Sequence, residues 1–120
     1  MWICLKNGFL SVVRDKKSDQ FVVRARVREH LEDNFPGFKI TAYTGSDYPY
    51  RIFISRKEMA QFLTDEMWDI DYTNFKNEVE DKSLQNFYAA VWTAGIYVLE
   101  KEDWYSKYYD EKQKAHSSIG

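Results

Sequence analysis

One stretch of eight residues constrains the fold more than any other part of the chain. Residues 21–28 read Phe-Val-Val-Arg-Ala-Arg-Val-Arg. Side chains alternate between the two faces of a β-strand, so the four apolar residues share one face. Arg24, Arg26 and Arg28 share the other face, spaced about 7 Å apart. We therefore predict a strand that covers a hydrophobic core on one side and presents a row of guanidinium groups on the other.

A β-hairpin is predicted immediately before this strand. Asn7 and Gly8 separate two apolar runs. Asn-Gly is the strongest short-range signal for a two-residue turn in which both residues take φ > 0. Such a turn places Leu5 opposite Leu10 and gives the hairpin one apolar face, because a slip by one residue would turn that face to water.

Short helix and strand patterns follow the arginine-rich strand. A helix is predicted over residues 29–35, and strands over residues 38–43 and 50–55. Ser55 and Glu58 form a capping box, in which the hydroxyl satisfies a free backbone N–H and the carboxylate reaches back. This box begins a helix that runs to about residue 68. Its apolar stripe consists of Met59, Phe62, Leu63 and Met67.

Two more helices are predicted in the second half of the chain. Asp71 or Thr73 caps a short one, and Ser83 caps a long one that ends near residue 99. The long helix is expected to be buried at Leu84, Phe87, Tyr88, Val91, Trp92 and Val98. The order β-β-β-α-β-β-α-α-α is typical of an α+β fold, with an antiparallel sheet of about five strands and helices packed on one face. We predict a single α+β domain over residues 1–110 and a flexible tail over residues 111–120.

Composition and missing motifs argue against the common enzyme classes. The chain has 120 residues, a formal net charge of −2, one cysteine and two histidines. As the single cysteine, Cys4 makes neither an internal disulfide nor a multi-cysteine metal site, and it is expected to be a small buried side chain. His30 lies among charged residues and is expected on a solvated face. The sequence contains no Gly-rich phosphate loop, nucleophile elbow or zinc motif. We expect a protein that is not an enzyme and has no cofactor and no metal, and whose net charge gives no strong nucleic-acid or membrane signal.

Arginine and tyrosine side chains form the candidate ligand-binding site. Its predicted residues are Arg24, Arg26, Arg28, Tyr48, Tyr50 and Arg51. Adjacent guanidinium groups bind phosphate or carboxylate in a bidentate manner, and aromatic rings beside an arginine stack on planar groups. Structural alternatives stay open at this point. Neighbouring Asp and Glu residues neutralise the arginines, or the arginine row is unpaired and fully hydrated. The tyrosines could likewise merely cover the edge of the core.

Two other features bear on partners and metals. A candidate partner-binding surface consists of Trp104, Tyr105, Tyr108 and Tyr109, because exposed aromatic residues are common anchors in interfaces. Asp69 and Asp71 could supply oxygen ligands to a divalent ion. Helix termination and capping explain these two carboxylates more simply. We therefore predict no metal site.

Four segments of the chain resemble an uncharacterised family of short bacterial and phage proteins. They are GFLSVV, VRAR, GSDYPYR and IDYTNFK, beginning at Gly8, Val23, Gly45 and Ile70. With the Met-Trp opening they carry the resemblance over roughly residues 1–98. The resemblance implies no activity and no catalytic residue. Its presence in phages implies at most a part in phage–host conflict.

These observations favour a small binding protein for an anionic, nucleotide-like ligand, with anti-defence as the role in a phage. The alternative is a protein–protein inhibitor or assembly subunit that binds a host protein through the aromatic C-terminal segment. A single cysteine and the lack of a signal-peptide pattern predict a cytoplasmic protein, in the host cytoplasm if the chain is phage-encoded. An open sheet edge favours pairing, so a homo-oligomer is also expected.

Overall fold

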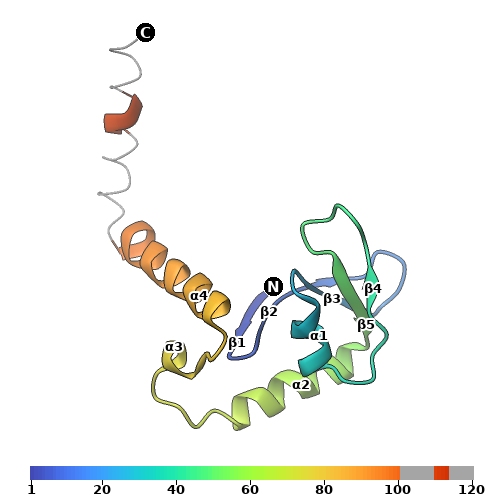
Figure 1. Ribbon diagram of the computed structural model, residues 1–120. Helices are drawn as coiled ribbons and strands as arrows, with labels where there is room; N and C mark the ends of the chain where they lie inside the picture. The colour runs from blue at the N-terminus through green and yellow to red at the C-terminus, as the bar shows by residue number, and fades with distance from the viewer. Residues whose placement is uncertain (101–109, 114–120) are drawn as a thin grey trace. The chain divides into compact units, whose positions relative to one another are not determined.

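The computed structural model describes residues 1–100 and 110–113 (Figure 1). The chain divides into two compact units, Met1–Leu84 and Gln85–Gly120. The first unit contains the sheet and the helices that pack on it. The domain predicted over residues 1–110 and the tail predicted over residues 111–120 stay predictions. Among the residues that the structure describes, no helix is long and apolar enough to cross a membrane.

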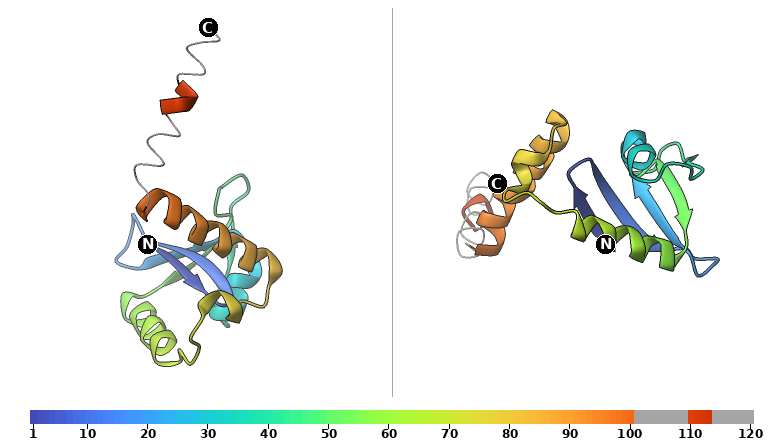
Figure 2. Two further views of the ribbon diagram at one scale, coloured as in Figure 1. Left: turned by 90° about the vertical axis from the view of Figure 1, so that its left-hand side faces the viewer. Right: turned by 90° about the horizontal axis from the view of Figure 1, so that it is seen from below.

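The first unit is built on a five-stranded antiparallel sheet, which confirms the predicted α+β fold. Its strands are β1 (Trp2–Leu5), β2 (Gly8–Arg14), β3 (Phe21–Ala25), β4 (Thr41–Ala42) and β5 (Tyr50–Ile54). They lie in the order β1-β2-β3-β5-β4, so β3 is the central strand. Figure 2 shows the twist of this sheet from two further sides.

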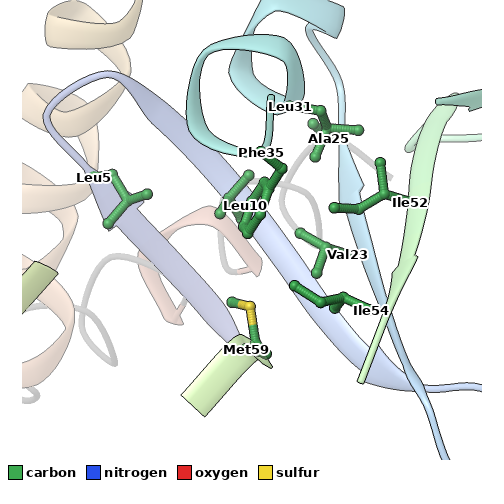
Figure 3. Close-up of a cluster of buried hydrophobic side chains, with 9 residues drawn as sticks. All are labelled: Leu5, Leu10, Val23, Ala25, Leu31, Phe35, Ile52, Ile54 and Met59. Carbon is green, nitrogen blue, oxygen red and sulfur yellow. The ribbon is translucent and has the colours of Figure 1, made fainter. Parts of the chain in front are cut away.

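Helices α1 (Arg28–Asn34) and α2 (Arg56–Trp68) contribute side chains to one core on one face of the sheet. Three helix-side residues point toward the strand residues Leu10 and Val23 (Figure 3). They are Leu31 in α1, Phe35 directly after α1, and Met59 in α2. Leu10, Val23 and Leu31 are fully buried. The alternation predicted for β3 is therefore confirmed as far as Ala25, because Val23 and Ala25 lie in the core.

The hairpin prediction was right about the faces and wrong about the register. Leu5 pairs with Gly8, not with Leu10, and Leu10 pairs with Ile3. Neither Asn7 nor Gly8 has a positive φ, so the predicted turn is not formed. The physical reason is close packing: a Cβ added at Gly8 would lie 2.9 Å from Asn34 Nδ2 and 3.1 Å from His30 Cβ. Gly8 lets α1 approach the strand, and the turn moves to the two residues before it.

Two strands are shorter than predicted. β3 ends at Ala25, because a helix begins at Arg28, where the Arg28–Glu32 pair of i,i+4 spacing stabilises the first turn. The predicted strand over residues 38–43 is reduced to Thr41–Ala42. Gly37, with φ of 89°, turns the chain after α1, and Phe38 packs edge-on against Phe35 with ring centroids 6.2 Å apart. Phe38 thus serves the core rather than a strand ladder.

Both ends of α2 are as predicted, while the burial of its last apolar residue differs. The backbone N–H of Glu58 donates to Ser55 Oγ at 3.1 Å, and the Ser55 hydroxyl donates to Glu58 Oε1 at 2.9 Å. Met59 is buried and Phe62 and Leu63 pack against the core, but Met67 is 69% exposed. The apolar stripe therefore covers the sheet only along the first part of α2.

The remaining helices are α3 (Phe75–Glu78) and α4 (Lys82–Ala94), which continues as a π-helical segment, Gly95–Glu100. Asn74 caps α3 and Asp81 satisfies the Leu84 N–H in α4, so the caps predicted at Asp71 or Thr73 and at Ser83 were wrong. Leu84 and Tyr88 are buried as predicted. The other residues predicted to be buried in this helix are exposed: Phe87, Val91, Trp92 and Val98.

Candidate functional site

Two arginines of the central strands face each other on the side of the sheet opposite to the hydrophobic core. β3 and β5 pair so that Arg24 lies directly across from Arg51. The next pair along, Val23 and Ile52, points into the core, and strand alternation turns Arg24 and Arg51 to the other face. Like charges opposite each other on a sheet are destabilising unless something neutralises them.

Arg24 is held by neutral groups. Its Nη2 donates a hydrogen bond of 2.7 Å to the hydroxyl of Ser11, its partner across the β2–β3 ladder. Its guanidinium carbon lies 4.8 Å from the ring centroid of Tyr48. Arg24 Nε is buried and has no hydrogen-bond acceptor among the residues that the structure describes. A buried, charged N–H without an acceptor is costly, so Arg24 is held in this position at a cost to folding.

Tyr48 joins a third arginine to the pair. The Arg26 guanidinium carbon lies 5.1 Å from the Tyr48 ring centroid, on a ring that is itself only 5% exposed. Tyr48 therefore makes cation–π contacts with two arginines, and its ring is not open for stacking with a ligand. We call Arg24, Arg26 and Arg51 the arginine cluster.

Arg51 is fixed by the loop before β5. Its Nη2 donates to Ser46 Oγ at 3.0 Å and its Nε to the Tyr48 carbonyl oxygen at 3.4 Å. Its guanidinium carbon lies 4.6 Å from the ring centroid of Tyr43. Tyr43 is 41% exposed. The sequence did not identify Tyr43, because its contact with Arg51 depends on the antiparallel pairing of β4 with β5 and not on any local motif.

In the part of the chain that the structure describes, no carboxylate forms an ion pair with the arginine cluster. Within residues 1–100 and 110–113 the ion pairs of arginine residues are Arg28–Glu32 at 2.7 Å and Arg56–Asp19 at 3.0 Å. Neutralisation by Asp or Glu, one of the alternatives open from the sequence, thus applies to Arg28, and not to Arg24, Arg26 or Arg51 in this part of the chain. The cluster depends on hydroxyl, carbonyl and aromatic contacts that leave its net charge intact.

The arginine pair lines an open hollow of about 550 Å³, which we call the basic hollow. Its polar end contains Arg24, Arg51 and Tyr43, its floor is apolar, and its far end is the β2–β3 loop. The floor consists of Val13, Val22 and Phe53. The far end consists of Arg14, the last residue of β2, and the loop residues Asp15, Lys16 and Lys17. The one carboxylate, Asp15, accepts a hydrogen bond of 2.7 Å from the Ser18 hydroxyl, which lowers the pKa of Asp15.

The structure brings together four of the six predicted ligand-binding residues. Arg24, Arg26, Tyr48 and Arg51 meet on one face. Arg28 lies apart, at the start of α1, and Tyr50 lies on the opposite face, where it packs against the hydrophobic core. The predicted partner-binding residues lie outside the described residues: Trp104, Tyr105, Tyr108 and Tyr109.

Cys4 and the carboxylates Asp69 and Asp71 form no second candidate site in the described part of the chain. Cys4 is exposed rather than buried as predicted, and partial desolvation raises the pKa of its thiol, which disfavours the thiolate. Asp69 ends α2, where its N–H donates to the Asp65 carbonyl oxygen at 3.0 Å, in line with a role in helix termination. In the described part of the chain, no three His, Cys, Asp or Glu residues are arranged to hold a metal ion.

His30 is half-buried rather than solvated as predicted. Its Nδ1 accepts a hydrogen bond of 3.2 Å from the Phe9 backbone N–H, which fixes α1 to β2. It also borders an open hollow of about 470 Å³ whose acidic residues are Glu29, Asp33, Glu78, Glu80 and Asp81. Burial lowers the pKa of His30, although Asp81, Glu29 and Asp33 oppose this effect.

We expect the folded protein to lose stability as pH falls below about 6.5, the ordinary pKa of histidine. The unfolded chain then takes up a proton that folded His30 resists, and a protonated Nδ1 cannot accept from Phe9. The effect stays below about 1.4 kcal/mol per pH unit. Urea unfolding at pH 7.5 and 5.5 measures it, with His30→Asn as the matched variant, because its amide oxygen can replace Nδ1 without titrating. An equal pH dependence in both proteins would contradict this role of His30.

Comparison of the chain with protein-family models, with curated proteins and with solved structures finds no match. The functional argument therefore rests on the geometry of the arginine cluster and the basic hollow.

Proposed function

We propose that this chain is a non-enzymatic binding protein for an anionic, nucleotide-like ligand, and that the arginine cluster holds the anionic group. The observation that supports this most strongly is the uncompensated charge of the cluster. The chain has 19 acidic residues, yet none in the described part pairs with Arg24, Arg26 or Arg51. The buried Nε of Arg24 still lacks an acceptor there. An anion bound between the guanidinium groups would remove the repulsion between Arg24 and Arg51.

The positions of the remaining donors suit an oxyanion. Ser11 and Ser46 each accept from Nη2 of one arginine, and the Tyr48 carbonyl oxygen accepts from Arg51 Nε. These bonds orient the two guanidinium planes and leave Nη1 of each arginine without an acceptor in the described chain. Guanidinium groups fixed in this way lose little conformational entropy when they bind, and they match the geometry of phosphate and carboxylate oxygens. The apolar floor beside them offers a surface to the planar part of a nucleotide.

Calorimetry and thermal unfolding with pyrophosphate and with a panel of linear and cyclic mononucleotides test this proposal. We expect at least one of these anions to raise the melting temperature of the wild-type protein. Arg51→Gln should weaken its binding about 10- to 100-fold, as expected when charged hydrogen bonds of about 1.5–3 kcal/mol are lost.

Arg56→Gln is the matched control, because Arg56 is paired with Asp19 outside the cluster. It should leave the dissociation constant unchanged. Absence of binding by every anion of the panel, or equal losses in the two variants, would refute the proposal. Thermal unfolding without ligand confirms that each variant is folded.

A further inference from the structure

The basic hollow has three successive zones along the strands. The first contains Arg24 and Arg51, directly paired across β3 and β5. Two residues further along the same face, Val22 pairs with Val13 on one side and with Phe53 on the other. This second row lies about 7 Å from the first, since residues two apart in a strand are separated by two rises. The third zone is the loop with Lys16 and Lys17. Cationic groups thus lie on both sides of an apolar row.

The apolar row is open to solvent at its two ends. Phe53 is 39% exposed and Val13 is 38% exposed, although both lie within strands. An exposed aromatic ring on a sheet, beside cationic side chains, is an arrangement on which a nucleic-acid base can stack. Because the cations are separated by this row, a compact anion such as pyrophosphate would contact only one end of the basic hollow.

The far end of the basic hollow is held in place. The Asp15 N–H donates to the Gln20 carbonyl oxygen at 2.9 Å, and the Gln20 N–H donates to Ser18 Oγ at 3.3 Å. Arg56 Nε also donates to the Asp19 carbonyl oxygen at 3.1 Å, which ties the loop to the start of α2. These bonds fix the backbone that carries Lys16 and Lys17.

The lining charge is strongly positive although the chain as a whole is acidic. The basic hollow contains five cationic side chains, Arg14, Lys16, Lys17, Arg24 and Arg51, and one carboxylate, Asp15. The formal net charge of the chain is −2. The positive charge is therefore concentrated where the exposed ring lies, and it would act at short range rather than through a global field.

We propose that the ligand of the basic hollow is a short segment of single-stranded nucleic acid, an inference that rests on the proposed function and specifies its ligand. One phosphate binds the arginine cluster, a base stacks on Phe53, and a following phosphate contacts Lys16 and Lys17. Only a strand in which anionic and planar groups alternate contacts all three zones at once. A mononucleotide contacts the first two.

Fluorescence anisotropy with fluorescein-labelled hexathymidylate and hexauridylate tests this inference. We expect at least one of the two hexamers to bind at least tenfold more tightly than the corresponding mononucleotide. The affinity of the mononucleotide is measured by its competition with the labelled hexamer. The two probes distinguish DNA from RNA, and a preference for either supports the inference. The logarithm of the binding constant should fall with the logarithm of salt concentration with a slope of about −1.4, as expected for two phosphate contacts of a single strand.

Three variants separate the zones. Replacing Lys16 and Lys17 by Gln should weaken oligonucleotide binding about tenfold and leave mononucleotide binding unchanged. Phe53→Leu, which keeps an apolar side chain, should weaken it at least fivefold through loss of stacking. Lys57→Gln is the control for loss of a lysine charge outside the basic hollow, since Lys57 is an exposed residue of α2, which packs on the core face of the sheet. It should change neither oligonucleotide binding nor mononucleotide binding.

The outcomes distinguish this inference from the proposed function. If mononucleotides bind as tightly as hexamers, or if the lysine variant binds hexamers normally, the ligand is not a strand, while anion binding at the arginine cluster stands. Equal affinity for a labelled 12-base-pair duplex would also overturn the inference, because paired bases cannot stack on Phe53. If neither hexamers nor mononucleotides bind, both proposals fail.

Discussion

Leu10→Ala should lower the free energy of unfolding by about 3 kcal/mol, within the usual range of about 2–5 kcal/mol for a buried leucine. Leu10 has no exposed surface and lies on β2 between α1 and the neighbouring strands. Removal of its isobutyl group takes away apolar burial and leaves a cavity that Leu31 and Val23, both in the same core, cannot fill without moving.

Urea unfolding measures this loss as a lower midpoint at an unchanged slope. Leu99→Ala is the matched control, because it deletes the same atoms from a side chain that is 81% exposed, and it should change stability by less than about 0.5 kcal/mol. A Leu10 variant as stable as the control would show that this face of the sheet is not the core.

The alternation of side chains predicted the fold because it depends only on local geometry. In β3 the same five residues that place Val23 and Ala25 in the core must place Arg24 on the other face. The capping box at Ser55 was predictable for the same reason, since its donor and acceptor are three residues apart. Features of this kind need no knowledge of the tertiary structure.

Features set by tertiary packing were not predictable in this way. Asn7-Gly8 has the composition of a hairpin turn, but the space required by His30 and Asn34 of α1 determines where Gly8 lies. The exposed residues of α4 show the converse, because the apolar pattern that predicts burial does not say what covers it.

The candidate site was only partly predictable from the sequence, for two reasons. Arg24 was identified from its own strand, but its neighbour Arg51 could be placed beside it only through the β3–β5 register. The formal net charge of −2 also conceals the basic hollow, because a sum over the chain does not show where the charges lie. The surfaces that matter for binding thus depend on pairing between distant segments.

Replacing Arg24 by Met together with Ser11 by Ala should raise the stability of the unliganded protein by about 1 kcal/mol and weaken ligand binding at least about 100-fold. Arg24 contributes a charge opposite Arg51 and a buried Nε without an acceptor in the described chain. Met keeps much of the packing volume on Tyr48. Changing Ser11 as well avoids a buried hydroxyl that has lost its partner, since Ser11 is only 1% exposed and bonds Arg24.

Urea unfolding without ligand and calorimetry with the tightest-binding mononucleotide measure the two effects on one protein. Ser11→Ala alone should lower stability by about 1 kcal/mol, because Arg24 then loses its acceptor on β2. Arg56→Met serves as the comparison at a paired arginine, and it should lower stability slightly, by no more than about 1 kcal/mol, because Asp19 loses its cation at an exposed site.

The expected changes in the free energy of unfolding have opposite signs for the Arg24 and Arg56 variants, and this difference decides between two roles of an arginine. An arginine kept for folding stabilises the unliganded protein, so its removal must lower stability, as we expect at Arg56. An arginine kept for a ligand is held at a cost to folding, and its removal must raise stability while binding is lost. A loss of more than about 1 kcal/mol in the Arg24→Met, Ser11→Ala protein would assign Arg24 to the first class and remove the main physical reason for placing an anion at the arginine cluster.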